Sequence, residues 1–246
     1  MTNPIFDVRG VDYDHPGGVP ALRGISFCVD EGECIAVLGA NASGKSTLFH
    51  LLDGLRFPTS GVIHAFGIHL TEDTVETPPF SREFRRQVGF LFQNSDAQLF
   101  SATVEEELAF GPLQLNLRAD EIDQRVEDIL QLLDIAHLKS RPPHLLSGGE
   151  KKRVALGSLL TVGPRVLLLD EPSAGLDPRT QTWLVGFLDT LHHAGITLLL
   201  ASHDLEFVRR TADRAIILSE EHRIVHDGPA AAALADTDLL ASANLI

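Results

Sequence analysis

The sequence is poor in cysteine and in positive charge, and both shortages argue against whole classes of protein. It has only 2 cysteines among 246 residues, too few for a small secreted domain held together by disulfides. Its 34 acidic residues outnumber 20 basic ones, which gives a formal net charge of -14 at pH 7. Such a chain repels the phosphate backbone of DNA and RNA, so we expect no nucleic-acid partner.

Long hydrophobic runs are also missing. The longest apolar runs, at 166–169 and 196–201, have the length of strands, whereas a helix needs roughly 20 apolar residues to span a bilayer. Residues 1–9 lack the basic and then apolar pattern of a secretory signal. We therefore expect a cytosolic protein unless a partner holds it elsewhere.

The cysteines and histidines offer no metal site by their spacing. Cys28 and Cys34 lie symmetrically about a turn predicted at 30–32, which suggests that they face each other across a hairpin as two buried free thiols. The 11 histidines are scattered, and their closest cluster is His192 and His193 on a predicted helix. Because metal ligands need converging spacings, we expect solvated or capping histidines.

The order of apolar patterns predicts an α/β fold. Apolar and polar residues alternate over 6–15 and 25–29, which predicts antiparallel strands. A continuous apolar run at 34–38 leads through a glycine-rich loop into a helix predicted at 47–55. Together with the runs at 166–169 and 196–201, these patterns indicate a parallel sheet covered by helices on both faces.

Two further segments are predicted to be helical. Residues 119–133 place apolar side chains at helical spacing among acids, which predicts an amphipathic helix and a separate helical lobe; these are Ile122, Val126, Ile129, Leu130 and Leu133. After residues 227–229 the chain becomes rich in alanine. There we expect a short helical tail and no additional domain.

Residues 39–47 have the spacing of a phosphate-binding P-loop and lie between a predicted strand and a predicted helix. Glycines let backbone N–H groups turn toward phosphate oxygens, and the helix N-terminus adds partial positive charge. The alternative is a glycine-rich turn that binds nothing. We expect Lys45 to reach the β- and γ-phosphates of ATP and Ser46 to bind Mg²⁺, with further contacts from Gly39, Asn41, Ala42, Ser43, Gly44 and Thr47.

Asp170 and Glu171 follow the predicted strand at 166–169, at the end where ligands gather in parallel sheets. Adjacent acids at this position can divide the work of hydrolysis, with Asp170 holding Mg²⁺ and Glu171 orienting and deprotonating the attacking water. Taken alone, the pair is more typical of a helix cap. The P-loop upstream favours the catalytic interpretation.

Residues 146–150, Leu-Ser-Gly-Gly-Glu, also start a predicted helix. Taken alone, they form an ordinary capping box, although such a helix end can also bind an anion. The P-loop, this LSGGE segment, the apolar strand ending in Asp170 and Glu171, and the segment 202–204 occur in the order typical of ATP-binding cassette proteins. The chain resembles that family over nearly its whole length.

The resemblance implies a P-loop NTPase core of RecA type with an N-terminal antiparallel β subdomain and an inserted α-helical subdomain. We expect one domain over 1–246, with the core and antiparallel strands at about 1–80 and 155–228, the helical subdomain at 81–154 and the tail at 229–246. The family also implies pairing of two cassettes head to tail, so that Ser147, Gly148 and Gly149 of one chain close over the nucleotide of the other.

Other roles rest on the resemblance alone. It implies that Gln93 links Mg²⁺ and the attacking water to the helical lobe, that His203 contacts the γ-phosphate, and that Asp177 lies at the dimer seam. In isolation, Gln93 and His203 would be unremarkable polar residues. An aromatic residue that stacks on adenine often precedes the proline of the first loop in this family. This chain has His15 there, and Tyr13 is an alternative, although core packing suits Tyr13 as well.

Residues 93–100, 103–107 and 109–112 resemble the energy-coupling-factor branch of importers, particularly the cobalt or nickel transport ATPases. In that branch this surface receives helices of a membrane-embedded coupling protein. Leu99 and Phe100 are apolar residues in a predicted loop and suit such a role, although they could also pack under the lobe. His15 is one departure from the family pattern, Ala42 at a position where glycine is common is a second, and the third is that the dimerisation segment which many relatives carry is not found after Ile246, so the resemblance does not imply a permanent dimer.

The sequence therefore predicts an ATP-hydrolysing motor subunit that uses ATP and Mg²⁺. We expect a homodimer or a heterodimer with a related ATPase, held at the cytoplasmic face of the inner membrane by the coupling protein and a substrate-binding membrane subunit. Cobalt, nickel and a vitamin are the candidate solutes, in that order. A soluble clamp on DNA or ribosomes is disfavoured because sustained heptads and a second cassette are missing. A subunit that never hydrolyses ATP is disfavoured by Glu171 and His203.

Overall fold

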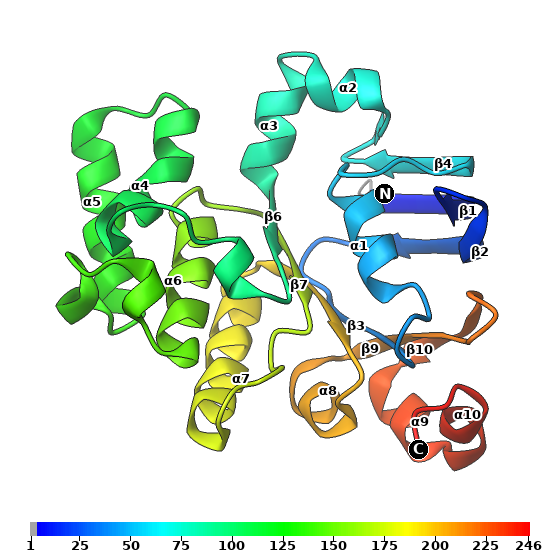
Figure 1. The fold of residues 1–246 in the computed structure, drawn as a ribbon. Coiled ribbons are helices and arrows are strands. Elements are labelled where there is room, and N and C mark those ends of the chain that lie inside the picture. Colours follow the sequence, from blue (N-terminus) through cyan, green and yellow to red (C-terminus); the bar gives the residue numbers. More distant parts are fainter. Residues whose placement is uncertain (1–3) are drawn as a thin grey trace.

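The computed structural model describes residues 4–246 and contains two β-sheets (Figure 1). The smaller sheet is antiparallel with the order β2-β1-β4-β5, made of β1 (Phe6–His15), β2 (Val19–Val29), β4 (Ser60–Ala65) and β5 (Ile68–His69). The larger sheet has the order β10-β9-β3-β8-β7-β6, made of β3 (Cys34–Gly39), β6 (Val88–Leu91), β7 (Val166–Asp170), β8 (Thr197–Ser202), β9 (Arg214–Leu218) and β10 (Ile224–Pro229). Its strands run parallel except β10, which pairs antiparallel with β9.

The larger sheet separates two hydrophobic cores, which explains the continuous apolar runs in the sequence. Along β3, Cys34, Ala36 and Leu38 belong to one core, while Ile35 and Val37 belong to the other. The side chains of a strand alternate between faces, so a strand covered on both sides must be apolar at every position. The predicted parallel sheet with cover on both faces is therefore confirmed.

Helices and the antiparallel sheet supply that cover. Helix α1 (Lys45–Leu52) and the antiparallel strands form one core, whereas α7 (Pro178–His193) and α8 (Leu205–Thr211) contribute to the other. The short helices α2 (Glu72–Glu76) and α3 (Phe80–Gln87) follow the antiparallel sheet, and α9 (Ala230–Ala235) and α10 (Thr237–Ser242) end the chain. No helix within residues 4–246 is long and apolar enough to cross a bilayer.

Three helices gather at the end of the molecule opposite the antiparallel strands (Figure 1, green): α4 (Val104–Gln114), α5 (Ala119–Leu132) and α6 (Gly148–Leu160). Helix α5 begins at the predicted residue and buries Ile122, Val126 and Leu130 on one face. Three short 3-10 helices connect this region, η1 (Ser95–Ala97), η2 (Ala136–Leu138) and η3 (Pro143–Leu145).

Two local predictions were wrong. The helix predicted at 47–55 spans Lys45–Leu52, because its N-cap is Gly44 and the chain turns at Gly54 with a φ of 66°. Cys28 and Cys34 do not face each other, since β2 belongs to the antiparallel sheet and β3 to the parallel one. Cys28 is exposed and only Cys34 is buried, and its burial raises the pKa of that thiol to about 12.

Candidate nucleotide site

The P-loop connects β3 to α1 and needs glycine at two positions for steric reasons. A Cβ atom on Gly39 would lie 2.3 Å from the Ser43 hydroxyl oxygen, and one on Gly44 would lie 2.3 Å from the backbone oxygen of Ala21. Gly44 also adopts a φ of 113°, which other residues rarely adopt. At these two positions the loop therefore packs so closely against its surroundings that a side chain has no room.

Lys45 is buried at the start of α1. Its Nζ donates hydrogen bonds to the backbone oxygens of Gly39 at 2.8 Å and Ala40 at 3.1 Å, and lies 3.8 Å from Oε1 of Glu171. Burial lowers the pKa of this ammonium, although the charge of Glu171 opposes the shift. A buried ammonium that relies on neutral carbonyl groups for hydrogen bonds is well placed to exchange them for phosphate oxygens.

Asp170 ends β7 beside Ser46. Burial raises the pKa of this carboxyl group, and a hydrogen bond with the Ser46 side chain opposes the shift. Its Oδ1 atom is buried without a hydrogen-bond partner. A hydroxyl group beside a carboxylate with an unsatisfied oxygen is a donor set that suits Mg²⁺, so these residues fit the implied metal.

Glu171 follows directly and has a strained backbone, with a φ of 46°. Its Oε1 accepts a hydrogen bond from Nδ1 of His203 at 2.9 Å, and the His203 side chain is 56% exposed. Oε1 of the buried carboxylate thus contacts both the Lys45 ammonium and a solvent-facing imidazole. This geometry suits a general base that must be oriented toward one direction.

A cavity of about 410 Å³ opens at the P-loop. The structure brings there the predicted residues His15, Asn41, Ala42, Gly44, Lys45, Ser46, Thr47, Gln93 and Glu171. Four lining residues were not foreseen, namely Val19, Pro20, Ala21 and His222. No local motif marks them, because they enter the cavity through the folding of β2 and of the turn between β9 and β10.

His15 and Tyr13 differ in their position at this cavity. His15 lines it, and its Nε2 lies 3.4 Å from the Thr47 hydroxyl oxygen. Tyr13 is buried in the core, where its hydroxyl accepts a hydrogen bond from Arg56, and its ring packs edge-on against His15 at 5.3 Å. His15 is therefore the ring available to a ligand, with Tyr13 behind it.

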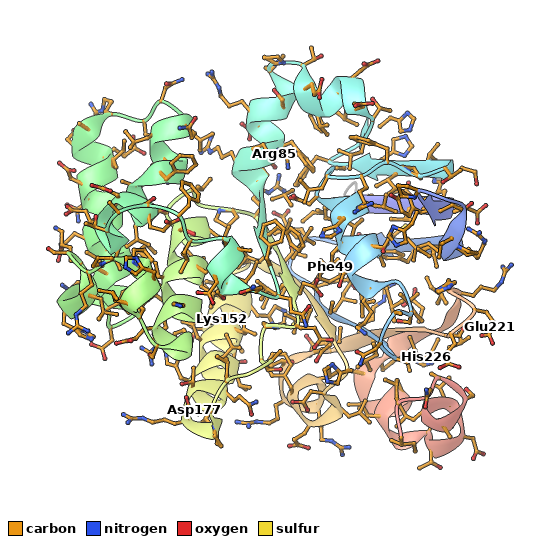
Figure 2. The ribbon with its side chains drawn as sticks, viewed as in Figure 1. Phe49, Arg85, Lys152, Asp177, Glu221 and His226 are labelled. Atoms are coloured by element: carbon orange, nitrogen blue, oxygen red, sulfur yellow. The ribbon has the colours of Figure 1, made fainter. Side chains whose placement is uncertain are left out.

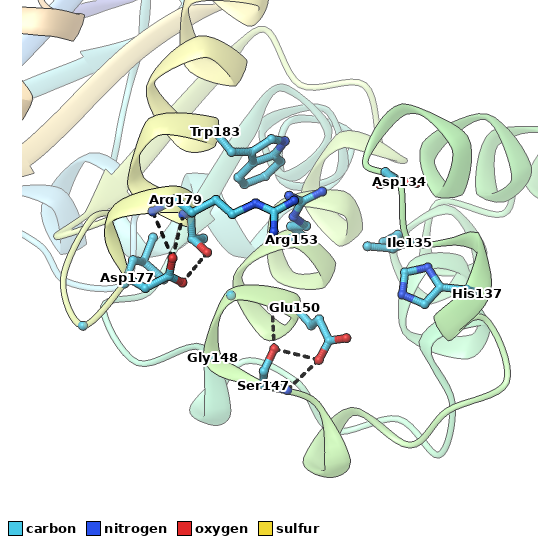
Figure 3. Close-up of a pocket in the computed structure, with 14 residues that line it drawn as sticks. Asp134, Ile135, His137, Ser147, Gly148, Glu150, Arg153, Asp177, Arg179 and Trp183 are labelled. Atoms are coloured by element: carbon cyan, nitrogen blue, oxygen red, sulfur yellow. Dashed lines mark hydrogen bonds between the residues drawn. The ribbon is translucent and has the colours of Figure 1, made fainter.

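The LSGGE segment lines a different and larger cavity of about 840 Å³ (Figure 3). Ser147 caps α6 through reciprocal hydrogen bonds with Glu150, and Asp177 caps α7 by accepting hydrogen bonds from backbone N–H groups of Arg179 and Thr180. The capping box considered for Ser147 is thus present. Gly148, Gly149 and Gly175 complete this wall. No residue lines both cavities, so one chain does not bring the P-loop and the LSGGE segment together.

Gln93 connects the P-loop cavity to the helical part of the molecule. Its side chain lines the cavity, while its backbone oxygen accepts a hydrogen bond of 3.4 Å from Nζ of Lys152 on α6. Lys152 is buried on the side of α6 that faces the sheet (Figure 2). The helix that begins at the LSGGE segment therefore holds the loop that carries Gln93, and sequence reasoning missed this role of Lys152.

The segment after Gln93 presents an apolar surface. Phe100 is 66% exposed and packs edge-on against Phe110, which is 42% exposed, whereas Leu99 packs against the core. The buried carboxylate of Glu107 accepts hydrogen bonds from the backbone N–H groups of Phe100 at 2.9 Å and Ser101 at 2.8 Å. The loop is thus held in place while an aromatic pair stays in solvent.

Comparison with known proteins identifies the family. The family model described as ABC transporter matches residues 22–174. The chain is 48% identical to the nickel import ATP-binding protein NikO of Rhodobacter capsulatus, covering 99% of this chain and 96% of that one. It is 39% identical to the energy-coupling factor transporter ATP-binding protein EcfA of Methanothermobacter thermautotrophicus, covering 98% and 76%.

A solved structure agrees with both relatives. The structure of cbiO1 from Clostridium perfringens, described as part of the ABC transporter complex cbiONQ, matches with a TM-score of 0.84 and 36% identity. The match covers 99% of this chain and 95% of that one. Its agreement extends over both sheets and the helical region. This chain therefore belongs to the ABC transporter family, as an ATP-binding and ATP-hydrolysing subunit of the energy-coupling-factor type.

Proposed function

We propose that this chain is the motor subunit of an importer for nickel or cobalt ions, and that two chains close on two ATP molecules to drive it. The observation that carries the proposed pairing is the separation of the P-loop cavity from the LSGGE cavity within one chain. Each of the two cavities provides part of a nucleotide site. A head-to-tail pair would complete both sites at once, which is a symmetric and closed arrangement.

In the proposed site, Lys45 leaves the carbonyl groups of Gly39 and Ala40 and binds the β- and γ-phosphates of ATP. Asp170, Ser46 and Gln93 would hold Mg²⁺, which when bound neutralises charge on the phosphates. Glu171 orients a water molecule and accepts its proton, and His203 keeps the carboxylate in position through its Nδ1 atom. Ser147 and Gly149 of the second chain close over the γ-phosphate, and Asp177 lies at the seam.

Closure must reach a membrane partner if it is to drive transport. The side chain of Gln93 lines the cavity in which the γ-phosphate would bind. Lys152 holds the same loop against α6 through the backbone oxygen of Gln93. The exposed pair Phe100 and Phe110 lies just beyond in the sequence and would anchor helices of a membrane-embedded coupling protein. A substrate-binding membrane subunit would complete the complex at the cytoplasmic face of the inner membrane. ATP then acts by binding the closed pair more tightly than the open one.

The choice of a metal ion is supported by the relatives, because one is a nickel import protein and another belongs to a complex called cbiONQ. Uptake assays test it directly. Cells that depend on this chain should accumulate radioactive Ni²⁺ or Co²⁺, and deletion of the chain should remove that uptake. Loss of vitamin uptake with normal metal uptake would reassign the cargo without changing the motor role.

The membrane partner is tested by purifying the tagged chain from native membranes. We expect integral membrane proteins to copurify with it, and Phe100→Asp to reduce their recovery at least roughly tenfold, as for loss of an interface hot spot, without changing the folding of the isolated chain. The matched control is Leu132→Asp, which changes a residue that is 54% exposed at the end of α5. Equal recovery from both variants would contradict the docking role of Phe100, and no membrane protein with the unchanged chain would contradict the importer assignment.

A further inference from the structure

Strained backbone is concentrated at the P-loop cavity. Among residues 4–246, seven residues other than glycine adopt a positive φ between 46° and 66°. Three of these seven line the same cavity, namely Ala42 at 66°, Glu171 at 46° and His222 at 63°. Residues in this conformation persist where the surrounding structure or a function requires them. Ala42 and Glu171 belong to motifs already described, whereas His222 does not.

His222 lies in the connection between β9 and β10, where it is the last of the three residues between Ser219 and Arg223, and its neighbour Glu221 is labelled in Figure 2. The backbone N–H of His222 donates to Ser219 at 3.0 Å, and that of Ser219 donates to Arg223 at 2.9 Å. A three-residue loop with this pattern places its last residue in the left-handed conformation, for which glycine is favoured. A histidine is therefore an unfavourable choice for the turn itself.

The imidazole of His222 instead contacts the P-loop. Its Nδ1 lies 3.2 Å from the backbone oxygen of Ser43, 179 residues away in the sequence. A carbonyl oxygen can only accept, so Nδ1 carries the hydrogen and donates it. The backbone oxygen of His222 also accepts a hydrogen bond of 2.9 Å from the N–H of Arg23 on β2. The ring is thus anchored at the wall of the cavity by the P-loop and by the strand behind it.

The second ring nitrogen is left for a ligand. With the hydrogen on Nδ1, Nε2 of the neutral ring is an acceptor, and it has no hydrogen-bond partner in the described part of the chain. An acceptor cannot bind phosphate oxygens, which are acceptors themselves. It suits a hydroxyl donor, and in the proposed site the sugar of ATP would lie between the phosphates at Lys45 and the base at His15, in the cavity that His222 also lines. We propose that His222 is a nucleotide-binding residue whose Nε2 accepts a hydrogen bond from a ribose hydroxyl of ATP.

Nucleotide binding by the full-length chain tests this inference, which rests on the nucleotide site proposed above and not on transport. Titration calorimetry in a Glu171→Gln background, where ATP survives, compares ATP with 2′-deoxy-ATP and 3′-deoxy-ATP. We expect His222→Gly to weaken ATP binding roughly 3- to 10-fold, as for loss of one hydrogen bond. At least one deoxynucleotide should bind the parent and the variant equally, and the melting temperature should not fall, because glycine suits the turn.

Two variants make the result specific. Asn116→Gly changes another residue with positive φ, at 57°, in the turn after α4 and outside the cavity, and it should leave affinity unchanged. Lys45→Ala must weaken binding if the site itself is correct. If Lys45→Ala weakens binding while His222→Gly binds all three nucleotides like the parent, the role of His222 is refuted and the site stands. An equal loss for all three nucleotides in His222→Gly would refute the sugar contact.

Discussion

The P-loop cavity and the LSGGE cavity differ in how far the chain satisfies its own polar groups. At the P-loop, Lys45 and Asp170 are buried charged groups, Asp170 keeps one oxygen without a partner, and three lining residues have a strained backbone, against one, Asp134, at the LSGGE cavity. At the LSGGE segment, Ser147 and Asp177 are exposed, and both make complete sets of capping hydrogen bonds (Figure 3). The first surface is prepared for a ligand, whereas the second is already stable by itself.

This difference means that the two motifs affect the stability of a single chain unequally. Buried charge and strain cost stability, and a chain keeps them where binding returns that free energy. Helix caps whose hydrogen bonds are made within the chain do not lower its stability, so the LSGGE surface can stay exposed in the monomer until a partner binds. The comparison predicts that changes at the LSGGE surface leave the monomer intact and affect only events that need two chains.

Ser147→Arg gives the largest expected effect. A long cation at this exposed cap should block closure over the second chain, so ATP hydrolysis should fall at least about 10²-fold, the loss typical for removing one group that stabilises a developing charge. Nucleotide binding by the monomer should be unchanged, because no residue lines both cavities. Phosphate release measures the first quantity and titration calorimetry the second.

The companion variant for this comparison is Glu171→Gln. It should also stop hydrolysis, but it should allow two chains to close on ATP, so analytical ultracentrifugation should detect a dimer that Ser147→Arg cannot form. Normal turnover by Ser147→Arg would mean that one chain suffices for hydrolysis. The contrast between the two cavities would then have no functional meaning.

Asp53→Asn tests the buried charge on the P-loop side. Asp53 ends α1, where burial raises the pKa of its carboxyl group to about 7 despite the hydrogen bond from Arg85. Between about pH 4 and pH 7 the folded state keeps this proton while the unfolded chain has lost it, so stability falls as pH rises. The variant lacks this loss, and its stability advantage should grow to at most about 4 kcal/mol by pH 8.

Urea denaturation at a series of pH values measures that advantage. Asp123→Asn is the matched control, because Asp123 is an exposed residue on α5 in the helical part of the molecule. Its difference from the unchanged chain should not vary with pH. An advantage of Asp53→Asn that is constant from pH 5 to pH 8 would show that the buried carboxyl group does not titrate in this range.

Much of the fold could be predicted because its signals are local. The apolar runs of β7 and β8 and the helical spacing in α5 each arise within one segment, and a buried strand or an amphipathic helix follows from that segment alone. The hairpin predicted for Cys28 and Cys34 was wrong because the chain passes from one sheet to the other between β2 and β3, and no local pattern records which sheet a strand joins.

The site residues that could be predicted are those that lie within sequence motifs. Lys45, Asp170 and Glu171 lie within patterns whose chemistry requires those residues at those spacings. His222 and Lys152 were missed because each acts through a contact with backbone far away in the sequence, at Ser43 and Gln93. Backbone atoms carry no sequence signal, so a side chain that recognises them is visible only once the chain has folded.

Ala42→Gly gives the smallest expected effect and measures the strain in the P-loop. Ala42 is exposed with a φ of 66°, a conformation that costs an alanine about 1–2 kcal/mol, while glycine adds about 0.5–1 kcal/mol of entropy to the unfolded chain. The variant should therefore be more stable by up to about 1 kcal/mol in urea denaturation without nucleotide. Ala40→Gly, in the same loop but without a positive φ, should be less stable by about 0.5–1 kcal/mol. If both variants lose stability equally, Ala42 is not strained in solution, and the P-loop cavity keeps only Glu171 and His222 as strained residues.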